Sequence, residues 1–414
     1  MKSKEIKTTI QYHNGLPVGE VPIPEPKKKT KRKPEQPDKP IAQILPKLQK
    51  QPKRKTSEHP HRFPYRWTLA GGYPPLTKGK VFSSFICGGG STMGYKLAGF
   101  EVLGGIEIDK EMAARYEANH KPKHLYVEGI QEFKLRPKKS LPKELFNLDI
   151  FDGSPPCSSF SMAGNREDDW GKEKVFKEGQ ALQTLDTLFF DFIDTVELLK
   201  PKVAVAENVK GLLMGNARQY VRRIYEAFDK AGYIVQHWLF DASRMGVPQK
   251  RERVFFVALR KDLCAPFMER IDMFTMKPKI NLTFNEHPIK FGEYRSEVGI
   301  DGSSKERGAL MDFRIKTDKS CNDINLRIHG KTSGFNSMIL HDNEVCGTIT
   351  AGELNWRYCD GRLCTNEDYL LTGSYPLDYD FGAKQNDYSF VKYMVGMSVP
   401  PVMTAQIATE IYEQ

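Results

Sequence analysis

The sequence predicts an α/β protein in which helices cover both faces of a mainly parallel, doubly wound sheet, with a second, smaller domain. Short apolar runs, such as 81–86, 203–206 and 254–259, alternate with amphipathic stretches such as 185–199. Strands that alternate with helices indicate parallel pairing. Ligands of such sheets bind at the carboxyl ends of the strands. We therefore expect the polar residues that follow strands to gather along one edge.

The basic charge of the chain is concentrated in residues 1–78. This segment has 18 Lys and Arg against 6 Asp and Glu and half of the 26 prolines, whereas the remaining residues have 44 basic and 46 acidic side chains. Such a segment buries too little apolar surface to offset its ordering entropy, so we expect a disordered tail. It suits contacts with nucleic-acid phosphates, or a linker or docking arm. The aromatic side chains of residues 62–75 could instead pack on the folded domain.

Cysteine usage and hydropathy exclude several protein classes. The seven cysteines are odd in number and form no C-x-x-C pair, which argues against a disulfide framework and a four-cysteine zinc site. We expect no metal and an intracellular location. The first residues contain no apolar signal segment, and no run approaches the roughly 18 apolar residues of a membrane helix. The protein is expected to be soluble.

A glycine turn and a pair of acids indicate a nucleotide-type site. The run 81–86 leads into Cys87-Gly88-Gly89-Gly90 and then into a helical pattern. A second apolar run, 102–109, ends in acids about 20 residues after the glycines, a spacing at which a carboxylate can bind ribose hydroxyls. Such a turn can also serve only to reverse the chain.

Two polar residues follow buried strands. Cys157 comes after Pro155-Pro156 in a loop that follows the run 148–152, which is typical of a presented, reactive thiol rather than a structural one. Glu207 follows the apolar run 203–206, where a carboxylate is costly unless it is paired or functional. It could act as a general acid or bond a base edge, or belong to a helix N-cap region.

A third candidate cluster opens the strand at 254–259. Alternation places Gln249, Arg251 and Arg253 on one face and Lys250 and Glu252 on the other. Three donors on one face can hold a phosphate or a base carbonyl. The alternative is an ordinary charged start to a strand.

Taken in order, these segments resemble the motifs of the cytosine-C5 DNA methyltransferase family. The matching stretches are Phe85–Gly94, Gly153–Cys157, Glu207–Val209, Gln249–Arg253, Arg362–Pro376 and Gly396–Pro401. The likeness covers roughly residues 80–263 and 346–414. It implies a Rossmann-like S-adenosylmethionine-dependent methyltransferase sheet and a smaller target-recognition domain. The expected parts are the tail (1–78), a catalytic domain (79–263), a target-recognition domain with hinge (264–383), and a segment that returns to the catalytic domain (384–414).

The resemblance also implies an activity and a site. The expected reaction is methylation of carbon 5 of a cytosine flipped out of double-stranded DNA, by a monomer that could belong to a restriction-modification system with a cognate restriction enzyme. Cys157 would add to carbon 6, Glu207 would bond N3 and the exocyclic amine, and Arg253 would meet O2, with Arg251 and Gln249 steadying the site. The residues expected to bind S-adenosylmethionine are Phe85, Gly88, Gly89, Gly90, Glu107, Ile108, Ile130, Leu188, Ser398 and Val399.

Three positions depart from the family pattern. Cys87 replaces a glycine, Met397 replaces an asparagine, and Gly129 stands where the family tends to place an aspartate that meets the adenine amino group. Glu128 could substitute for that aspartate, or the affinity for the cofactor could be weaker. Two other functions remain open: a tRNA cytosine-C5 methyltransferase, and a DNA-binding homologue without activity.

Overall fold

The computed structural model falls into two units, residues 1–58 and 59–414. It describes residues 8–13, 16–22, 61–156, 173–174, 183–184, 187–214, 217–265, 271–272, 277–278, 280–305, 307–332, 337–350, 352 and 354–414. In the first unit, β1 (Thr8–His13) and β2 (Leu16–Pro22) form an antiparallel hairpin. The chain therefore forms two strands within the expected disordered tail, and residues 23–60 of that tail lie outside the described residues. No helix in the described part is long and apolar enough to cross a membrane.

A seven-stranded sheet forms the centre of the second unit, with the order β10-β11-β9-β6-β3-β4-β5. Its strands are β3 (Lys80–Ser84), β4 (Glu101–Ile106), β5 (His124–Tyr126), β6 (Ile150–Gly153), β9 (Val203–Val209), β10 (Tyr233–Asp241) and β11 (Glu252–Arg260). All neighbours pair in parallel except β11, which is antiparallel to both β9 and β10. The predicted mainly parallel α/β sheet is confirmed.

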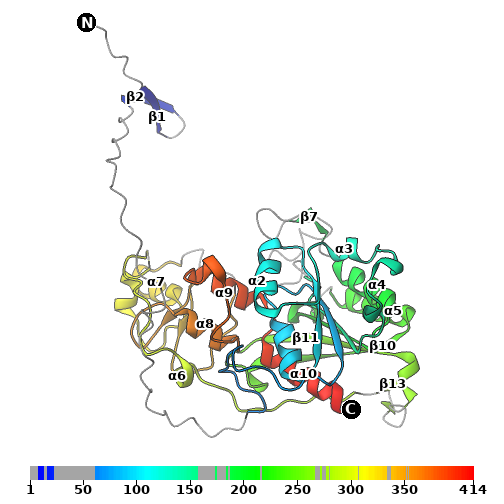
Figure 1. The fold of residues 1–414 in the computed structure, drawn as a ribbon. Coiled ribbons are helices and arrows are strands. Elements are labelled where there is room, and N and C mark those ends of the chain that lie inside the picture. Colours follow the sequence, from blue (N-terminus) through cyan, green and yellow to red (C-terminus); the bar gives the residue numbers. More distant parts are fainter. Residues whose placement is uncertain are drawn as a thin grey trace, which may run out of the picture. The chain divides into compact units, whose positions relative to one another are not determined.

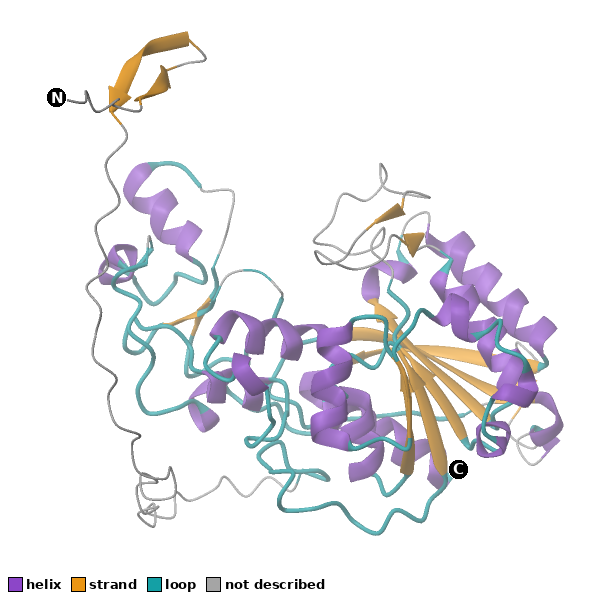
Figure 2. Cartoon of the chain, turned by 45° about the horizontal axis from the view of Figure 1, so that its top comes forward, coloured by secondary structure: helices purple, strands orange, loops and turns teal. Residues whose placement is uncertain are grey.

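Helices cover both faces of the sheet (Figures 1 and 2). On one face, α3 (Ile130–Phe133), α4 (Leu188–Leu199) and α5 (Ala217–Ala231) share a core with inward side chains of the strands. On the other face, α1 (Gly90–Leu97) packs against α10 (Pro401–Glu413), the last helix of the chain. Helix α2 (Lys110–His120) follows β4. The buried residues of α4 recur at three and four positions, as an amphipathic helix on a sheet requires.

A second lobe of short elements adjoins the sheet. Its helices are α6 (Phe291–Tyr294), α7 (Cys321–His329), α8 (Asn366–Thr372) and α9 (Tyr388–Met397), and β14 (Ile339–Leu340) pairs with β15 (Trp356–Arg357). The remaining short elements of the chain are β7 (Glu173–Lys174), β8 (Gln183–Thr184), β12 (Ile271–Asp272), β13 (Lys277–Pro278) and the 3-10 turns Lys138–Ser140, Lys143–Phe146, Lys210–Leu213, Ala242–Arg244, Lys261–Leu263, Ala309–Phe313 and Gly382–Lys384.

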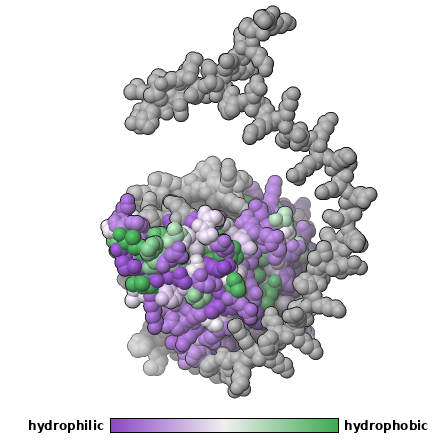
Figure 3. Space-filling view, turned by 90° about the vertical axis from the view of Figure 1, so that its left-hand side faces the viewer, coloured by the Kyte–Doolittle hydropathy of each residue, from purple (hydrophilic) through white to green (hydrophobic). Residues whose placement is uncertain are grey.

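Figure 3 shows apolar spots on a largely hydrophilic face. Exposed apolar side chains of this lobe are Val298, Phe313, Ile315, Leu326 and Ile328.

Residues 61–78 are ordered and bridge the two lobes. Arg62 donates to Glu410 at 2.7 Å on α10. Trp67 is buried and donates its Nε1–H to the carbonyl of Ser374 at 2.9 Å, and Asp378 accepts the backbone N–H of Leu69. The structure therefore differs here from the expected disordered tail. These residues follow the alternative expectation, in which the aromatic side chains of residues 62–75 pack on the folded domain.

Replacing Trp67 by alanine should lower the free energy of unfolding by about 3 kcal/mol. The substitution leaves a cavity, and it leaves the carbonyl of Ser374 without its hydrogen-bond donor. Urea unfolding measures the change. Phe313→Ala is the matched control, since this aromatic side chain is 58% exposed and its loss should cost little. Equal effects of the two substitutions would show that residues 61–78 add nothing to the fold.

Candidate active site

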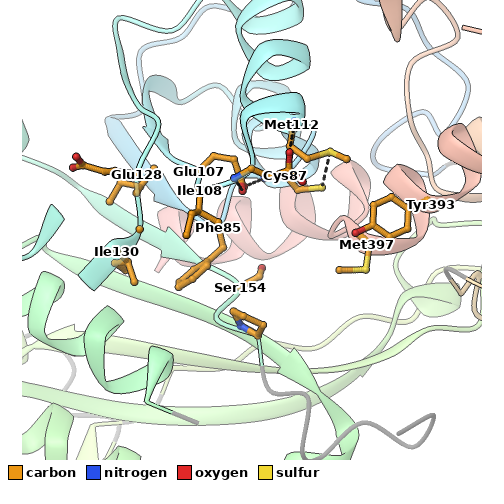
Figure 4. Close-up of a pocket in the computed structure, with 14 residues that line it drawn as sticks. Phe85, Cys87, Glu107, Ile108, Met112, Glu128, Ile130, Ser154, Tyr393 and Met397 are labelled. Atoms are coloured by element: carbon orange, nitrogen blue, oxygen red, sulfur yellow. Dashed lines mark hydrogen bonds between the residues drawn. The ribbon is translucent and has the colours of Figure 1, made fainter. Parts of the chain in front are cut away.

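A cavity of about 140 Å³ opens at the carboxyl ends of β3, β4 and β6. This is the edge at which a parallel sheet binds its ligand. Figure 4 shows side chains from several elements turned toward this space. The lining residues are Phe85, Cys87, Ile106, Glu107, Ile108, Asp109, Met112, Glu128, Gly129, Ile130, Ser154, Pro156, Tyr393 and Met397. Its wall is thus mainly apolar, with acidic residues at positions 107, 109 and 128.

The buried carboxylate of Glu107 holds two turns together. Its Oε2 accepts the backbone N–H of Cys87 and its Oε1 accepts that of Asp109, each at 2.8 Å. Phe85 and Cys87 have φ values of 55° and 48°, which side chains other than glycine adopt at a cost. The two hydrogen bonds help to keep the turn after β3 in this conformation, so that Phe85 and Cys87 face the cavity.

Burial changes the protonation of several groups at this edge. Desolvation raises the pKa of Glu107 to about 7, although its backbone hydrogen bonds oppose the shift. Desolvation also raises the pKa of Asp152 to about 7, and that of the Cys87 thiol to about 12. Cys87 is therefore a neutral, polarisable wall of the cavity at physiological pH and a poor nucleophile.

The three glycines of the turn pack against the chain. A Cβ on Gly90 would lie 2.2 Å from the carbonyl oxygen of Val399, and one on Gly88 would lie 2.6 Å from the sulfur of Met394. Ser398 is buried and donates its hydroxyl to the carbonyl of Met394 at 2.9 Å. Among the predicted cofactor residues, Gly90 thus contacts Ser398 and Val399 of the α9–α10 connection, Gly88 packs on α9, and Gly89 packs on His120 of α2. None of these five residues belongs to the lining of the cavity.

The other predicted cofactor residues divide into two groups. Phe85, Glu107, Ile108 and Ile130 line the cavity. Leu188 does not: it is fully buried in the core between α4 and the sheet. Leu188 is the first residue of α4 and belongs to the apolar face from which this helix is predicted. It therefore packs in the core and does not reach the cavity.

Glu207 and Arg253 form a buried ion pair at the same edge. Arg253 Nε lies 2.9 Å from Glu207 Oε1, and the two side chains are 15% and 11% exposed. β11 runs antiparallel to β9 and pairs Arg253 with Val209, so the start of β11 meets the end of β9. The pairing of Gly153 with Ala206 places the loop after β6 beside Glu207.

Asn208 links this strand end to the loop that precedes Cys157. Its side-chain amide donates to the carbonyl of Pro155 at 3.0 Å, and its Oδ1 accepts the backbone N–H of Val209. Pro156 lines the cavity. Cys157 itself lies outside the described residues, so the structure places the loop as far as the residue before it.

Gln249 and Arg251 are buried and contact the second lobe. Gln249 Nε2 donates to the carbonyl of Thr372 at 3.2 Å, and Arg251 Nη1 donates to that of Gly396 at 2.8 Å. Desolvation, together with the nearby charge of Arg253, lowers the pKa of Arg251 to about 9. These two residues therefore join the lobes beneath the Glu207–Arg253 pair.

Sequence reasoning missed Met112, Tyr393 and Asn208. Tyr393 and Met397 are four residues apart on α9 and so share the face that lines the cavity, a spacing that could have predicted Tyr393. Met112 lies in the first turn of α2, directly after the predicted acids. Nothing in the sequence marks Asn208 as the partner of Pro155. Within the described residues, no group of three or more His, Cys, Asp or Glu could hold a metal ion.

Comparisons with known sequences agree with these features. A sequence model described as C-5 cytosine-specific DNA methylase matches residues 80–413. The type II methyltransferase M.NgoPII of Neisseria gonorrhoeae is 35% identical over 195 residues, covering 46% of this chain and 50% of that protein. M.FnuDI of Fusobacterium nucleatum is 38% identical over 187 residues, covering 44% and 48%. This chain thus spans about half the length of these two relatives. M.NgoFVII of Neisseria gonorrhoeae is 28% identical over 356 residues, covering 81% and 86%.

Solved structures share the fold. The Spodoptera frugiperda DNMT2 triple mutant superimposes with a TM-score of 0.53 at 16% identity, covering 80% of this chain and 99% of that one. The Entamoeba histolytica methyltransferase EhMeth gives a TM-score of 0.53 at 13% identity, covering 82% and 98%. At these identities the likeness concerns the fold alone.

Glu107→Gln should change how stability depends on pH. The carboxyl pKa rises from 4.5 to about 7 on folding, so its contribution is full below pH 4.5 and is lost as pH rises through about 7. Between pH 5.5 and 8, the wild type should lose about 2 kcal/mol more unfolding free energy than Glu107→Gln. Urea unfolding at both pH values tests this, with the exposed Glu226→Gln on α5 as control. Equal losses in the wild type and Glu107→Gln would contradict it.

Proposed function

Because this chain belongs to the C-5 cytosine-specific DNA methylase family, we propose that it transfers a methyl group from S-adenosylmethionine to carbon 5 of a cytosine in duplex DNA. The observation that carries the proposal is the buried Glu207–Arg253 pair, which adjoins the loop leading into Cys157 at the edge of the cavity. An acid and a cation held together with little exposure to solvent suit a polar heterocycle whose charge changes during reaction.

The cavity has the chemistry of an S-adenosylmethionine site. The buried carboxylate of Glu107 is an acceptor for ribose hydroxyls, and Ile108 with Phe85 offers apolar surface for the adenine. The backbone at Ile130 would meet the adenine edge. The glycine turn, with Ser398 and Val399 behind it, would support the methionine end, and Leu188 would support the site only through the core. When bound, the cofactor supplies the electrophilic methyl group.

Cys157 is the proposed nucleophile. Carbon 5 of cytosine is too weak a nucleophile to take a methyl group unaided. Addition of the Cys157 thiolate to carbon 6 forms a C–S bond and moves an electron pair toward carbon 5. Carbon 5 can then form a bond to the methyl carbon as the bond from that carbon to the sulfonium sulfur breaks, which leaves S-adenosylhomocysteine. Loss of the carbon-5 proton to a base and cleavage of the C–S bond return the thiolate and the aromatic ring. The hydrogen bond from Asn208 to Pro155 makes Asn208 a positioning residue for this loop.

Glu207 and Arg253 act on the same ring. In the proposed complex, Glu207 bonds N3 and the exocyclic amine and supplies a proton to N3, while Arg253 donates to O2, so that both offset the negative charge created by thiolate addition. Gln249 and Arg251 support them from behind, through their bonds to Thr372 and Gly396. A cytosine stacked in a duplex cannot reach such a site, so it must be flipped out.

The second lobe is the proposed reader of the DNA. We assign target recognition to residues 264–383 of this lobe. The remaining segment, 384–414, passes through α9, which packs in the second lobe, and returns to the sheet domain in α10. Several relatives are named type II methyltransferases, which supports a role in a restriction-modification system with a cognate restriction enzyme. We propose that the protein acts there as a monomer. Bacillus phage SPR has a relative named an orphan methyltransferase, 34% identical over 166 residues, so a solitary role is the alternative.

Cys157→Ser should abolish methyl transfer, because the hydroxyl cannot replace the thiolate in the addition step. The assay measures radiolabelled methyl transfer to duplex DNA and, in parallel, to a tRNA transcript. Glu226→Gln is the control, since Glu226 is exposed on α5, away from the cavity lining and the second lobe, and it should keep full activity. Bisulfite sequencing of the product identifies the methylated cytosine. Turnover by Cys157→Ser above a few per cent, or transfer to tRNA alone, would overturn the proposal.

Deletion of residues 1–58 should weaken DNA binding at low salt and flatten the dependence of log affinity on log salt, because fewer counterions are released. The truncation stops at residue 58 so that Trp67 and its neighbours stay in place. The turnover at saturating DNA should be unchanged. Equal salt slopes for the full chain and the truncated chain would assign the basic segment to a linker or docking arm.

A further inference from the structure

The adenine end of the cavity lacks the expected carboxylate. Glu128 is the nearest acid in sequence, but Arg136 binds it through two hydrogen bonds, from Nε at 2.7 Å and from Nη2 at 2.6 Å. The Arg136 guanidinium also lies over the Tyr126 ring, 5.2 Å from its centroid. Figure 4 shows the Glu128 carboxylate turned away from the cavity. Glu128 is therefore committed to Arg136 and does not take the place of an acid at position 129.

Another side chain occupies the space beside Gly129. A Cβ built on Gly129 would lie 2.9 Å from Oε1 of Gln131 and 3.7 Å from Cδ1 of Ile108. Gly129 and Ile108 both line the cavity. The amide oxygen of Gln131 thus lies where a side chain at position 129 would begin, beside a glycine that lines the cavity.

We propose that Gln131 recognises the exocyclic amine of the cofactor's adenine, with its Oε1 as the hydrogen-bond acceptor. This assignment rests on the proposed S-adenosylmethionine site. It makes Gln131 a specificity residue for the cofactor, reached from α3 two positions beyond the glycine. The glycine is part of the arrangement, because a larger side chain there would displace the amide.

Glu132 is the competing acceptor. Its Oε2 lies 3.7 Å from the same Cβ position, but it already accepts the backbone N–H of Gly129 at 3.0 Å, and the residue is exposed. Gln131 is closer and partly buried. The observations therefore favour the amide.

A side-chain amide and a carboxylate form different hydrogen bonds with a purine. A carboxylate only accepts hydrogen bonds, so it rejects a 6-oxo purine, whereas an amide can turn over and donate its NH₂ instead. This chain should therefore distinguish adenine from hypoxanthine only weakly. A carboxylate at position 131 should restore strong discrimination.

The experiment measures binding of two product analogues, S-adenosylhomocysteine and S-inosylhomocysteine, to the full chain by calorimetry. The wild type should prefer the adenosyl compound by less than about tenfold, and Gln131→Ala should weaken its binding about fivefold. Gln131→Glu should keep adenosyl binding and weaken inosyl binding about tenfold. Adding Gly129→Asp to Gln131→Ala should restore adenosyl binding, because the alanine frees the space for the new carboxylate. Thermal unfolding checks that each variant folds.

The outcomes distinguish a failure of the role assigned to Gln131 from a failure of the proposed cofactor site. Unchanged binding by Gln131→Ala, or a loss that appears in Glu132→Gln instead, overturns the role of Gln131 and leaves the cofactor site intact. Failure of the wild type to bind S-adenosylhomocysteine at all overturns the proposed site and the assignment with it. Equal discrimination by the wild type and Gln131→Glu also contradicts the proposal.

Discussion

The candidate site depends on the carboxylate of Glu107 and its two backbone hydrogen bonds. These bonds connect the turn after β3 with the turn after β4, which belong to neighbouring strands. A buried carboxylate is costly to desolvate unless hydrogen bonds compensate it. The backbone N–H groups of Cys87 and Asp109 supply part of this compensation. The bond to Cys87 also helps to hold Phe85 and Cys87 at positive φ. The position of one side chain therefore shapes the wall of the cavity.

Strand β11, the one antiparallel strand of the seven-stranded sheet, explains how the second half of the site is built. A parallel sheet presents only the ends of its strands at the ligand edge, but an antiparallel strand presents its start. β11 thereby brings the segment 249–253 to the end of β9, where Arg253 meets Glu207. Burial follows the alternation expected from the sequence, with Gln249 and Arg251 inside and Lys250 and Glu252 outside.

Much of the fold could be predicted from the sequence, because hydrophobic periodicity is a local property. The alternation of strands and helices predicts the sheet, and the residues that follow its strands do meet at one edge. The contacts that join distant segments could not be predicted in this way. Gln249 bonds residue 372 and Arg251 bonds residue 396, and no local pattern specifies such partners.

The same limit applies to Trp67 and Leu188. Charge and proline content dominate the segment around Trp67 and favour disorder. The sequence indicates packing of its aromatic residues only as an alternative, and it does not specify that Trp67 packs against the second lobe. Leu188 matches a family position, but its burial in the core is a consequence of how α4 lies on the sheet. Cys157, the residue most clearly marked in the sequence, lies outside the described residues, and its role as the nucleophile stays a prediction.

The packing of α10 on α1 has a consequence for how the protein is made. Gly94 lies so close to α10 that a Cβ would meet the carbonyl of Pro401 at 2.4 Å, and residues 402–408 complete the core on that face of the sheet. Helix α1 therefore receives its cover from a helix that follows all seven strands of the sheet in the sequence. During synthesis, this apolar face stays open until α10 has been made, and contacts of such long sequence separation slow folding. The domain is consequently exposed to aggregation for as long as α10 has not docked.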